Sequence, residues 1–420
     1  MTHPDQSARR LAVVGPYPPY RGGIAQFTAA LHSALEAEGH TVTGISFSRQ
    51  YPGWLFPGRS QEVPTGAEAA APDARRLLDS LRPWTGIRAA RAAASSGATE
   101  LIFMVWMPFF APLYLLAARA ARNRGMTTTA IVHNALPHEK QPLARPLMRA
   151  LLRRMDRIIT LTQSEAARCG RLAGRDADSI TVSPHPVYDH FGAAMEPAAA
   201  RRILSWPPEG ACGLLFFGLI RRYKGLDLLL RALGALYRRS PGAPDFSLMI
   251  AGEFYEKERM YRDLVVREGL SDKVEICAQY IPDGEVAALF SAADLVVQPY
   301  RKATQSGVVQ TAFHFGCPVV VSDAGGLADM VRDGEDGMVV RWRGESERGE
   351  SECGEEDETV FVGALSYALE KALEPETLDR LTRGAVAARG RATWPGFARL
   401  FAQSGISMNP SRSQPCNMTR

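Results

Sequence analysis

The sequence predicts an α/β protein made of two doubly wound domains that face each other across a cleft. Three observations support this fold class. The chain has 420 residues, which is too long for one ordinary hydrophobic core. Short apolar runs alternate with segments of helical periodicity, which is typical of parallel strands joined by helices. The same alternation starts again after His185 and Pro186, so a second domain follows the first.

The first half opens as a strand, a glycine-bearing turn and a helix. Residues 11–15 form a short apolar run, and residues 24–38 have the period of a helix. Residues 40–47 then alternate like a second strand. Further buried strands are expected at the apolar runs 100–105, 127–133 and 157–162.

The second half repeats this order. A strand is expected at 213–217 and a helix at 225–237. Further strands are expected at 246–251, 274–277, 295–299 and 318–322. We therefore expect the two domains to join near residues 187–200.

Two segments are predicted to be disordered. Residues 344–359 hold eight acidic residues and almost nothing apolar, so they cannot bury enough surface to fold. The tail from Ser404 onward is polar and rich in Ser, Pro and Asn. We expect neither segment to carry chemistry.

The composition indicates a globular protein of a reducing compartment such as the cytoplasm. Six scattered cysteines show no paired spacing, which argues against a zinc site or a disulfide framework. No signal peptide is expected, because residues 1–10 are polar. The membrane-like stretch 101–118 is broken by Pro108 and Pro112, and a strand followed by a buried helix explains it better than a membrane span.

The charge is unevenly distributed. Residues 1–190 carry 22 basic against 14 acidic residues, whereas the remainder carries 27 against 31. A basic first half indicates an anionic partner there, either a membrane surface or a phosphorylated acceptor. Nucleic acid is not an expected partner, because the net charge is only +4 and aromatic and basic residues do not interleave.

A glycine pair follows the first strand and opens the first helix. Gly22 and Gly23 would let the backbone approach a ligand closely, and the helix N-terminus would present N–H groups to an anion. A plain tight turn explains the same residues. The motif alone is therefore a weak signal.

A basic turn lies between the strand and the helix that open the second domain. Arg221, Arg222 and Lys224 would stand at the carboxyl end of that strand, where ligands bind in open α/β sheets. Such cations suit a diphosphate leaving group, because negative charge develops on its oxygens as the bond to it breaks. A solvated basic turn is the alternative, and the apolar helix after Gly225 makes it less attractive.

Two more strand ends carry polar residues. Ser306 and Gly307 begin a helix after an Ala-Thr-Gln stretch and form a second phosphate cradle. His133 ends a strand and would face the cleft, where it could hydrogen-bond a sugar hydroxyl. His133 and the nearby His138 could instead be satisfied structural groups.

These four stretches, in this order, resemble glycosyltransferase family 4, a group of retaining enzymes with the GT-B fold. The resemblance spans roughly residues 11–400. It implies that Gly22 and Gly23 abut the donor phosphate and the acceptor, that His133 lines the sugar site, and that an Arg and Lys pair neutralises the donor diphosphate. It also implies that the segment around Trp394 crosses back onto the first domain.

The boundaries that follow are those of a two-domain transferase. The acceptor-side domain covers 1–190 and the nucleotide-sugar-binding domain covers 191–388. A returning helix at 389–403 and a disordered tail at 404–420 complete the chain.

The basic turn departs from the family pattern. The usual pattern is Phe-Val-Gly-Arg, with a lysine six residues after that glycine. This chain keeps Gly218 and Lys224 but has Leu219 in place of the arginine. Arg221 would therefore have to supply the second cation.

A larger departure concerns two glutamates of the family. Alignment on the later Gly-x-Pro places Ala303 and Thr311 where these glutamates stand, at the transferred sugar and at the ribose. A subset of the family has a similar Ala-Thr-Gln-Ser-Gly-Val stretch, which indicates a variant site. Gln305 and the backbone amides of the next two residues are the expected substitutes at the sugar, and Thr311 or Gln310 at the ribose.

By this resemblance the reaction moves a hexosyl unit from a nucleoside diphosphate sugar to an acceptor hydroxyl, with the anomeric configuration retained. His133, Arg221 and Lys224 are the expected catalytic residues. No metal or other cofactor is expected, because the two cations can take the electrostatic role while domain closure excludes water. Two alternatives stay open: a nucleotide-sugar-binding protein without catalysis, and a sugar phosphorylase or epimerase on the same architecture.

The acceptor is expected to be a glycan or a lipid-linked saccharide, in cell-surface polysaccharide or glycolipid assembly. The expected helix 143–157 carries five arginines beside a leucine-rich face. It could lie on the inner face of the cell membrane and bring the cleft to a lipid-linked acceptor. The alternative is an ordinary helix that packs on its domain and exposes its basic face to solvent.

Overall fold

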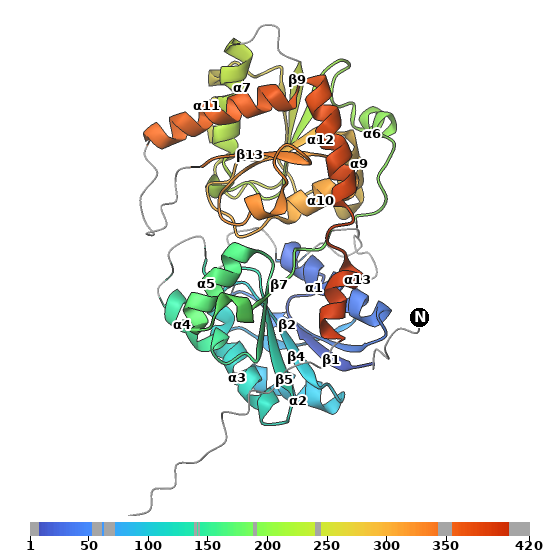
Figure 1. Cartoon of the computed structure of the whole chain (residues 1–420), viewed down its shortest axis with the longest axis vertical. Coiled ribbons are helices and arrows are strands. Elements are labelled where there is room, and N and C mark those ends of the chain that lie inside the picture. The colour runs from blue at the N-terminus through green and yellow to red at the C-terminus, as the bar shows by residue number, and fades with distance from the viewer. Residues whose placement is uncertain are drawn as a thin grey trace, which may run out of the picture.

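Two parallel β-sheets, each covered by helices, make up the computed structural model (Figure 1). The model describes residues 8–52, 61–62, 72–137, 141, 143–187, 191–239, 245–342 and 355–402. The strand orders are β3-β2-β1-β4-β5-β6-β7 and β10-β9-β8-β11-β12-β13. Neighbouring strands in both sheets are parallel. Each order reverses beside the first strand of its domain, so the expected doubly wound fold is confirmed.

The first sheet and its helices form the N-terminal domain. Its strands are β1 (Arg10–Val14), β2 (Thr41–Arg49), β3 (Ala74–Asp79), β4 (Glu100–Val105), β5 (Thr127–Val132), β6 (Arg157–Thr160) and β7 (Thr181–Val182). Its helices are α1 (Gly23–Ala37), α2 (Thr85–Ser95), α3 (Ala111–Arg122), α4 (Ala144–Leu152) and α5 (Gln163–Ala173). The central strands are buried on both faces, which explains why they read as apolar runs.

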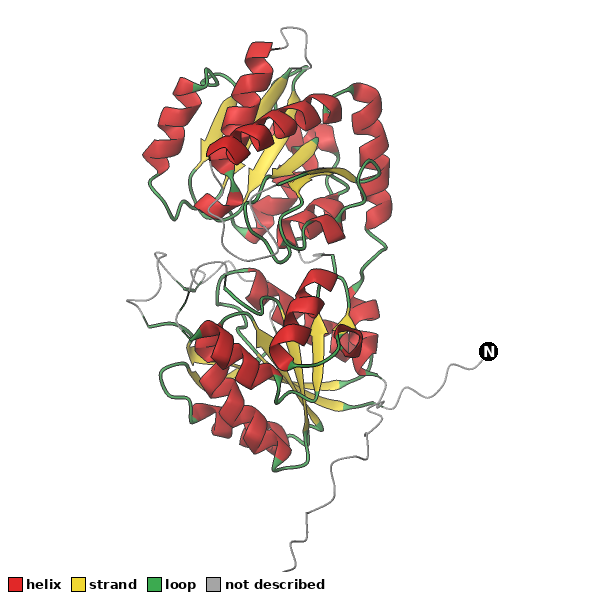
Figure 2. Ribbon diagram, turned by 60° about the vertical axis from the view of Figure 1, so that its left-hand side comes forward, coloured by secondary structure: helices red, strands yellow, loops and turns green. Residues whose placement is uncertain are grey.

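The second sheet and its helices form the C-terminal domain (Figure 2). Its strands are β8 (Cys212–Phe217), β9 (Phe246–Ala251), β10 (Val274–Cys277), β11 (Leu295–Gln298), β12 (Val319–Ser322) and β13 (Gly337–Val340). Its helices are α6 (Pro197–Leu204), α7 (Leu226–Arg239), α8 (Glu258–Arg267), α9 (Asp283–Ala292), α10 (Gly307–Phe315), α11 (Glu355–Ala372) and α12 (Pro375–Ala388). Successive residues of β8 and β9 enter different apolar clusters, so this sheet has a core on each face.

The chain returns to the N-terminal domain at its C-terminal end. Helix α13 (Trp394–Ala398) packs against α1. The ring of Phe27 in α1 lies 5.0 Å from the ring of Trp394 and 5.6 Å from that of Phe397. The N–H of Val187 donates to the carbonyl of Ala392 at 3.0 Å, so the outgoing and returning segments lie side by side.

The membrane-like stretch folds as the expected strand and buried helix. Strand β4 ends at Val105, and a short 3-10 turn (Pro108–Phe110) leads into α3. Among the described residues, the structure contains no helix that combines the length and the apolar character needed to cross a bilayer.

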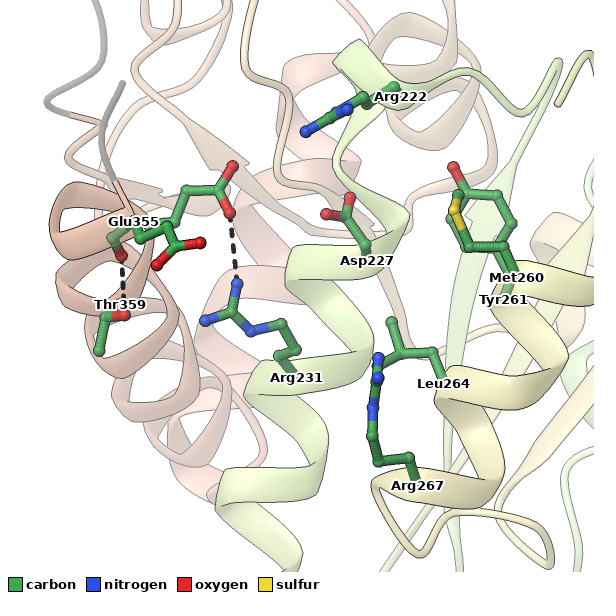
Figure 3. A pocket seen from close by; sticks show the side chains of 10 residues that line it. Arg222, Asp227, Arg231, Met260, Tyr261, Leu264, Arg267, Glu355 and Thr359 are labelled. Atoms are coloured by element: carbon green, nitrogen blue, oxygen red, sulfur yellow. Dashed lines mark hydrogen bonds and ion pairs between the residues drawn. The ribbon is translucent and has the colours of Figure 1, made fainter. Parts of the chain in front are cut away.

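The predicted disorder of residues 344–359 is wrong for the last five of them, which form the first turn of α11 (Figure 3). Carboxylates at a helix N-terminus interact favourably with the helix dipole. Glu358 also accepts hydrogen bonds from Arg301 at 2.6 and 3.0 Å and pairs with Arg231 at 3.3 Å. Composition alone showed the charges but not these partners. Residues 344–354 and 404–420 lie outside the described residues.

The helix expected over residues 143–157 is shorter in the structure, where α4 ends at Leu152. Arg153 and Arg154 follow its last turn, whereas Arg157 begins β6. The Arg157 guanidinium donates to the carbonyl of Leu400 at 2.7 Å. Arg157 therefore helps to hold the returning segment and does not belong to the basic helix face.

Truncation of Phe397 tests whether the returning segment stabilises the N-terminal domain. Its side chain is 2% exposed, so Phe397→Ala should lower the free energy of unfolding by about 3–5 kcal/mol. Scanning calorimetry should show this as a lower unfolding temperature. Val386→Ala, at a 46% exposed position of α12, is the control and should change stability by no more than about 0.5 kcal/mol. Equal effects of the two substitutions would contradict the anchoring role.

Candidate functional site

A cavity of about 310 Å³ lies between the two domains. Its walls come from the residues that follow the carboxyl ends of β8, β9, β10 and β11 and from the N-terminus of α1. Ligands of open α/β sheets bind at this edge, and the volume suits a small molecule. The cavity brings together seven of the predicted site residues: Gly22, Gly23, Lys224, Gln305, Ser306, Gly307 and Thr311.

A tight turn after β8 places Lys224 in the cavity wall. The chain turns at Gly218, which has a φ of 99°, and forms the 3-10 turn η3 (Arg222–Lys224). A β-carbon at position 218 would lie 3.2 Å from the Lys224 ammonium, so glycine leaves the room that this side chain needs. Lys224 is 9% exposed.

Lys224 is a buried cation without an acidic partner. No carboxylate of the described residues pairs with its ammonium, which lies 5.6 Å from the centre of the Tyr300 ring. Burial, followed by the charge of Arg221, lowers the pKa of Lys224 to about 8. Burying an unpaired charge is costly, and a phosphate oxygen bound in the cavity would offset that cost.

Two helices direct their N-termini at the same cavity. Helix α10 begins at Gly307, and α1 begins at Gly23. Neither helix has a side-chain cap or an acidic residue in its first turn. The Ser306 hydroxyl before α10 donates instead to the Gln298 side chain at 2.6 Å. The positive ends of two helix dipoles, one from each domain, therefore lie at the same cavity as Lys224, an arrangement that favours an anionic ligand.

Residues at the start of α1 also contact two carboxylates in the cavity wall. Arg21 pairs with Glu253 at 3.6 Å and lies over the ring of Tyr280 at 4.7 Å. Gln26 donates to Asp283 at 3.5 Å, and burial raises the pKa of the Asp283 carboxyl. These contacts cross the cleft and hold the two domains together around the cavity.

The residues at the variant positions also line the cavity. Ala303 and Thr311 stand in the wall beside Gln305. The Gln305 side-chain oxygen is buried and has no hydrogen-bond partner among the described residues, so a ligand hydroxyl would satisfy it. The Thr311 hydroxyl donates to the Gly307 carbonyl of its own helix at 2.9 Å, which leaves only its acceptor capacity for a ligand. Gln310 lies outside the lining.

His133 lies outside the lining of this cavity and is only 1% exposed. Its ring meets the ring of Phe27 edge-on at 4.6 Å, so α1 covers it. Burial, followed by the charge of His185, lowers the pKa of His133 to about 3, and the ring is neutral near pH 7. Neither ring nitrogen has a hydrogen-bond partner among the described residues. A contact between His133 and the transferred sugar stays a prediction, and His138 lies outside the described residues.

Arg221 also lies outside the lining, because its guanidinium stacks over the ring of Tyr255 at 4.8 Å. The sequence analysis missed a cation from the other domain, Arg21, which directly precedes the glycine pair. It also missed Glu253 and Asp283 as wall residues. Their sequence signal was their position, since Glu253 follows β9 closely and Asp283 begins α9.

A second cavity, of about 500 Å³, lies between α7, α8 and α11 of the C-terminal domain (Figure 3). Arginines and carboxylates alternate around it: Arg222, Arg231, Arg267, Asp227, Glu355 and Glu358. These charges balance, and Arg231 pairs with Glu358. Arg222 of the predicted basic turn lines this cavity, but none of the seven residues that meet in the cleft cavity does. The cleft cavity is therefore the candidate site.

Both domains match models of known protein families. Residues 22–186 match the model described as Glycosyl transferase 4-like domain. Residues 211–348 match the model described as Glycosyl transferases group 1. The two ranges together cover more than half of the chain.

Individual relatives agree with these matches. The D-inositol 3-phosphate glycosyltransferase of Acidothermus cellulolyticus is 32% identical over 245 residues, which are 57% of this chain and 50% of that protein. The chain thus spans about half the length of the curated relatives it matches. Sucrose-phosphate synthase from Thermosynechococcus elongatus has the same fold, with a TM-score of 0.68 and 18% identity over 94% of this chain and 97% of that chain. Anabaena Alr3699/HepE, solved with UDP and glucose, gives a TM-score of 0.66 and 16% identity over 93% and 98%.

The lowered pKa of Lys224 predicts how anion binding depends on pH. The free protein loses this charge as the pH rises through about 8, whereas a bound diphosphate stabilises the charged form. Binding should therefore take up protons, and affinity should fall by up to about tenfold per pH unit above pH 8. Calorimetric titration with UDP near pH 7 and pH 9, in buffers of different ionisation enthalpy, measures both effects.

Lys224→Arg is the control for this titration, because an arginine stays charged over the whole range. Its affinity for UDP should change little between the two pH values. An equally steep decline in this variant would mean that another group causes the pH dependence.

Proposed function

The chain belongs to the group 1 glycosyltransferases, and its N-terminal domain is a glycosyl transferase 4-like domain. We propose that it moves a hexosyl unit from a nucleoside diphosphate sugar to an acceptor hydroxyl. The observation that carries this proposal is the cavity itself. Lys224 and two helix N-termini converge there from both domains, at the edge where such sheets bind nucleotides. The UDP and glucose in Anabaena Alr3699/HepE support the choice of donor class.

In the proposed complex the donor diphosphate lies between Lys224 and the N-terminus of α10. Negative charge grows on the diphosphate as the bond to the sugar breaks. The ammonium and the helix dipole are already in place and need no reorganisation, so they stabilise that charge directly. The glycine pair at the start of α1 lets the backbone approach the same phosphate. No metal is needed in this scheme.

The transferred sugar would lie against Gln305. Its unpartnered side-chain oxygen can accept a hydrogen bond from a sugar hydroxyl. An uncharged amide in place of a family glutamate binds the hydroxyl without adding a negative charge near the diphosphate. Ala303 beside it leaves space and no nucleophile.

We propose that the configuration is retained by attack on the face that the diphosphate leaves. Both wall carboxylates, Glu253 and Asp283, are held by residues at the start of α1. In this scheme neither serves as a nucleophile. The acceptor oxygen forms a bond to the anomeric carbon while the bond to the diphosphate breaks, and a diphosphate oxygen takes the acceptor proton.

The proposed acceptor is a glycan or a lipid-linked saccharide, on the side of the cleft formed by the N-terminal domain. The proposed setting is cell-surface polysaccharide or glycolipid assembly at the inner face of the cell membrane. The excess of basic residues in the first 190 positions supports an anionic surface as the place of action.

Calorimetry with UDP, GDP, ADP and their sugar conjugates tests the donor proposal. One nucleotide should bind clearly, and Lys224→Met should weaken both the diphosphate and its sugar conjugate by about 10- to 100-fold, as expected for a lost charge-assisted hydrogen bond. Lys302→Met removes an exposed lysine near the cavity loop and is the matched control. No binding across the panel would overturn the transferase proposal.

Gln305→Ala separates sugar recognition from diphosphate binding. The affinity for the free nucleoside diphosphate should stay within about twofold, while turnover of the sugar conjugate should fall about tenfold for one lost hydrogen bond. Steady-state transfer assays and calorimetry on the same preparation measure the two effects. Donor binding with no transfer to any acceptor would instead favour the alternative of a binding protein without catalysis.

A further inference from the structure

One side of the N-terminal domain carries a basic helical face, formed by α2, α3 and α4. Helix α3 packs against both of the others (Figure 1). Residues 80–155 hold ten arginines and one lysine but only two glutamates. One glutamate, Glu100, is buried and pairs with Arg9 at 3.0 Å, and the other lies outside the described residues. Asp79 and the exposed Asp156 flank this range, so the face carries a large excess of positive charge.

The arginines of this face are exposed, and all but one of them form no ion pair with a carboxylate of the described residues. The exposed ones are Arg82, Arg88, Arg91, Arg119, Arg122, Arg124, Arg145, Arg149, Arg153 and Arg154. Only Arg82 forms an ion pair with a described carboxylate, that of Asp79 at 3.8 Å. Their spacing of three or four residues within each helix keeps them on the outer side, while alanines and leucines pack inward.

Large apolar side chains are exposed on the same face. Trp84 is 56% exposed and directly precedes α2, and Leu143 is 68% exposed and directly precedes α4. Leu81 and Leu116 are 43% and 37% exposed. Leu143 has a φ of 63°, which is uncommon for a leucine. Both helices begin at the edge of the sheet where the strands end, so Trp84 and Leu143 lie at the cleft end of the face.

We propose that the basic helical face docks onto an anionic phospholipid bilayer, with Trp84 and Leu143 entering its interface. Guanidinium groups bind phosphate oxygens in pairs, and each contributes about 1 kcal/mol near an anionic surface. Tryptophan and leucine favour the boundary between headgroups and acyl chains. A soluble polyanion would pair with the arginines but would give no reason for the exposed apolar side chains.

Docking in this way brings the opening of the cleft to the membrane surface, because the apolar end of the face is the cleft end. A lipid-linked acceptor could then enter the cleft without leaving the bilayer. This link to the acceptor rests on the proposed function, and the docking makes its membrane setting specific to one face, which can be tested without any transfer reaction.

Co-sedimentation of the full chain with vesicles tests the docking. The chain should bind vesicles of equal parts phosphatidylcholine and phosphatidylglycerol at least about tenfold more tightly than pure phosphatidylcholine, and salt should weaken the binding. Replacing Arg145, Arg149, Arg153 and Arg154 with glutamine should lower that affinity by about 100-fold. Equal binding of this variant and the unchanged protein would overturn the proposal.

The matched control replaces four exposed arginines of the C-terminal domain with glutamine: Arg202, Arg259, Arg332 and Arg380. It removes the same net charge and should bind vesicles like the unchanged protein. An equal loss in the control would mean that overall charge, not this face, drives the binding, and would overturn the proposal.

Trp84→Ser combined with Leu143→Ser distinguishes a bilayer from a soluble polyanion. This variant should bind the mixed vesicles at least about tenfold more weakly but bind polyphosphate as the unchanged protein does. Unchanged vesicle binding would overturn the bilayer proposal in favour of a polyanion. Calorimetry with UDP and thermal unfolding of every variant report on donor binding and folding separately, so failure of the docking and failure of the proposed function give different results.

Discussion

A buried ammonium group without an acidic partner is the constraint on which the site depends. Paired charges beside the turn hold the backbone that carries this group. The Arg301 guanidinium binds both carboxylate oxygens of Asp227 at 2.7 Å and also binds Glu358. The same guanidinium donates to the carbonyl of Arg222 at 3.0 Å, and the backbone N–H of Arg301 donates to the carbonyl of Tyr223 at 2.7 Å. Arg301 therefore links the backbone of the turn that carries Lys224 to Asp227 and Glu358. Lys224, whose ammonium has no acidic partner among the described residues, lines the cavity, where a ligand can reach it.

Neither domain contains this site alone. The C-terminal domain supplies the ammonium and one helix N-terminus, and the N-terminal domain supplies the other helix N-terminus. The contacts of Arg21 with Glu253 and Tyr280 cross the cleft at the same place. The electrostatic field in the cavity thus depends on how the two domains sit together. An anion that binds there favours the arrangement in which both helix ends reach it.

The sequence predicted most of the fold, because the strands are short and buried on both faces and therefore appear as apolar runs. The helices between them show a clear helical periodicity of apolar residues. Strands β9 and β10 agree with the prediction to the residue. Strand β3 was missed, since an edge strand with two arginines gives no apolar run. Gly22, Gly23, Lys224, Ser306 and Gly307 were predicted because they lie at turns between a strand and a helix, whereas Gln305 and Thr311 came from the family resemblance. The directions of His133 and Arg221 depend on packing against Phe27 and Tyr255, which local sequence does not encode. The first turn of α11 was missed for a similar reason, since its partners come from elsewhere in the chain.

The two crossings between the domains restrict how the domains can move. Two domains joined by a single flexible segment can rotate relative to each other about three axes. Here the outgoing and returning segments are joined by a hydrogen bond between Val187 and Ala392, so they act as a single pivot. We therefore expect relative motion of the domains to be a hinge rotation about an axis near this pair. Displacement grows with distance from such an axis, so the cleft residues far from it should move more than the residues around α13. We therefore expect the returning C-terminal segment to act as the hinge between the domains, in addition to its place in the hydrophobic core of the N-terminal domain.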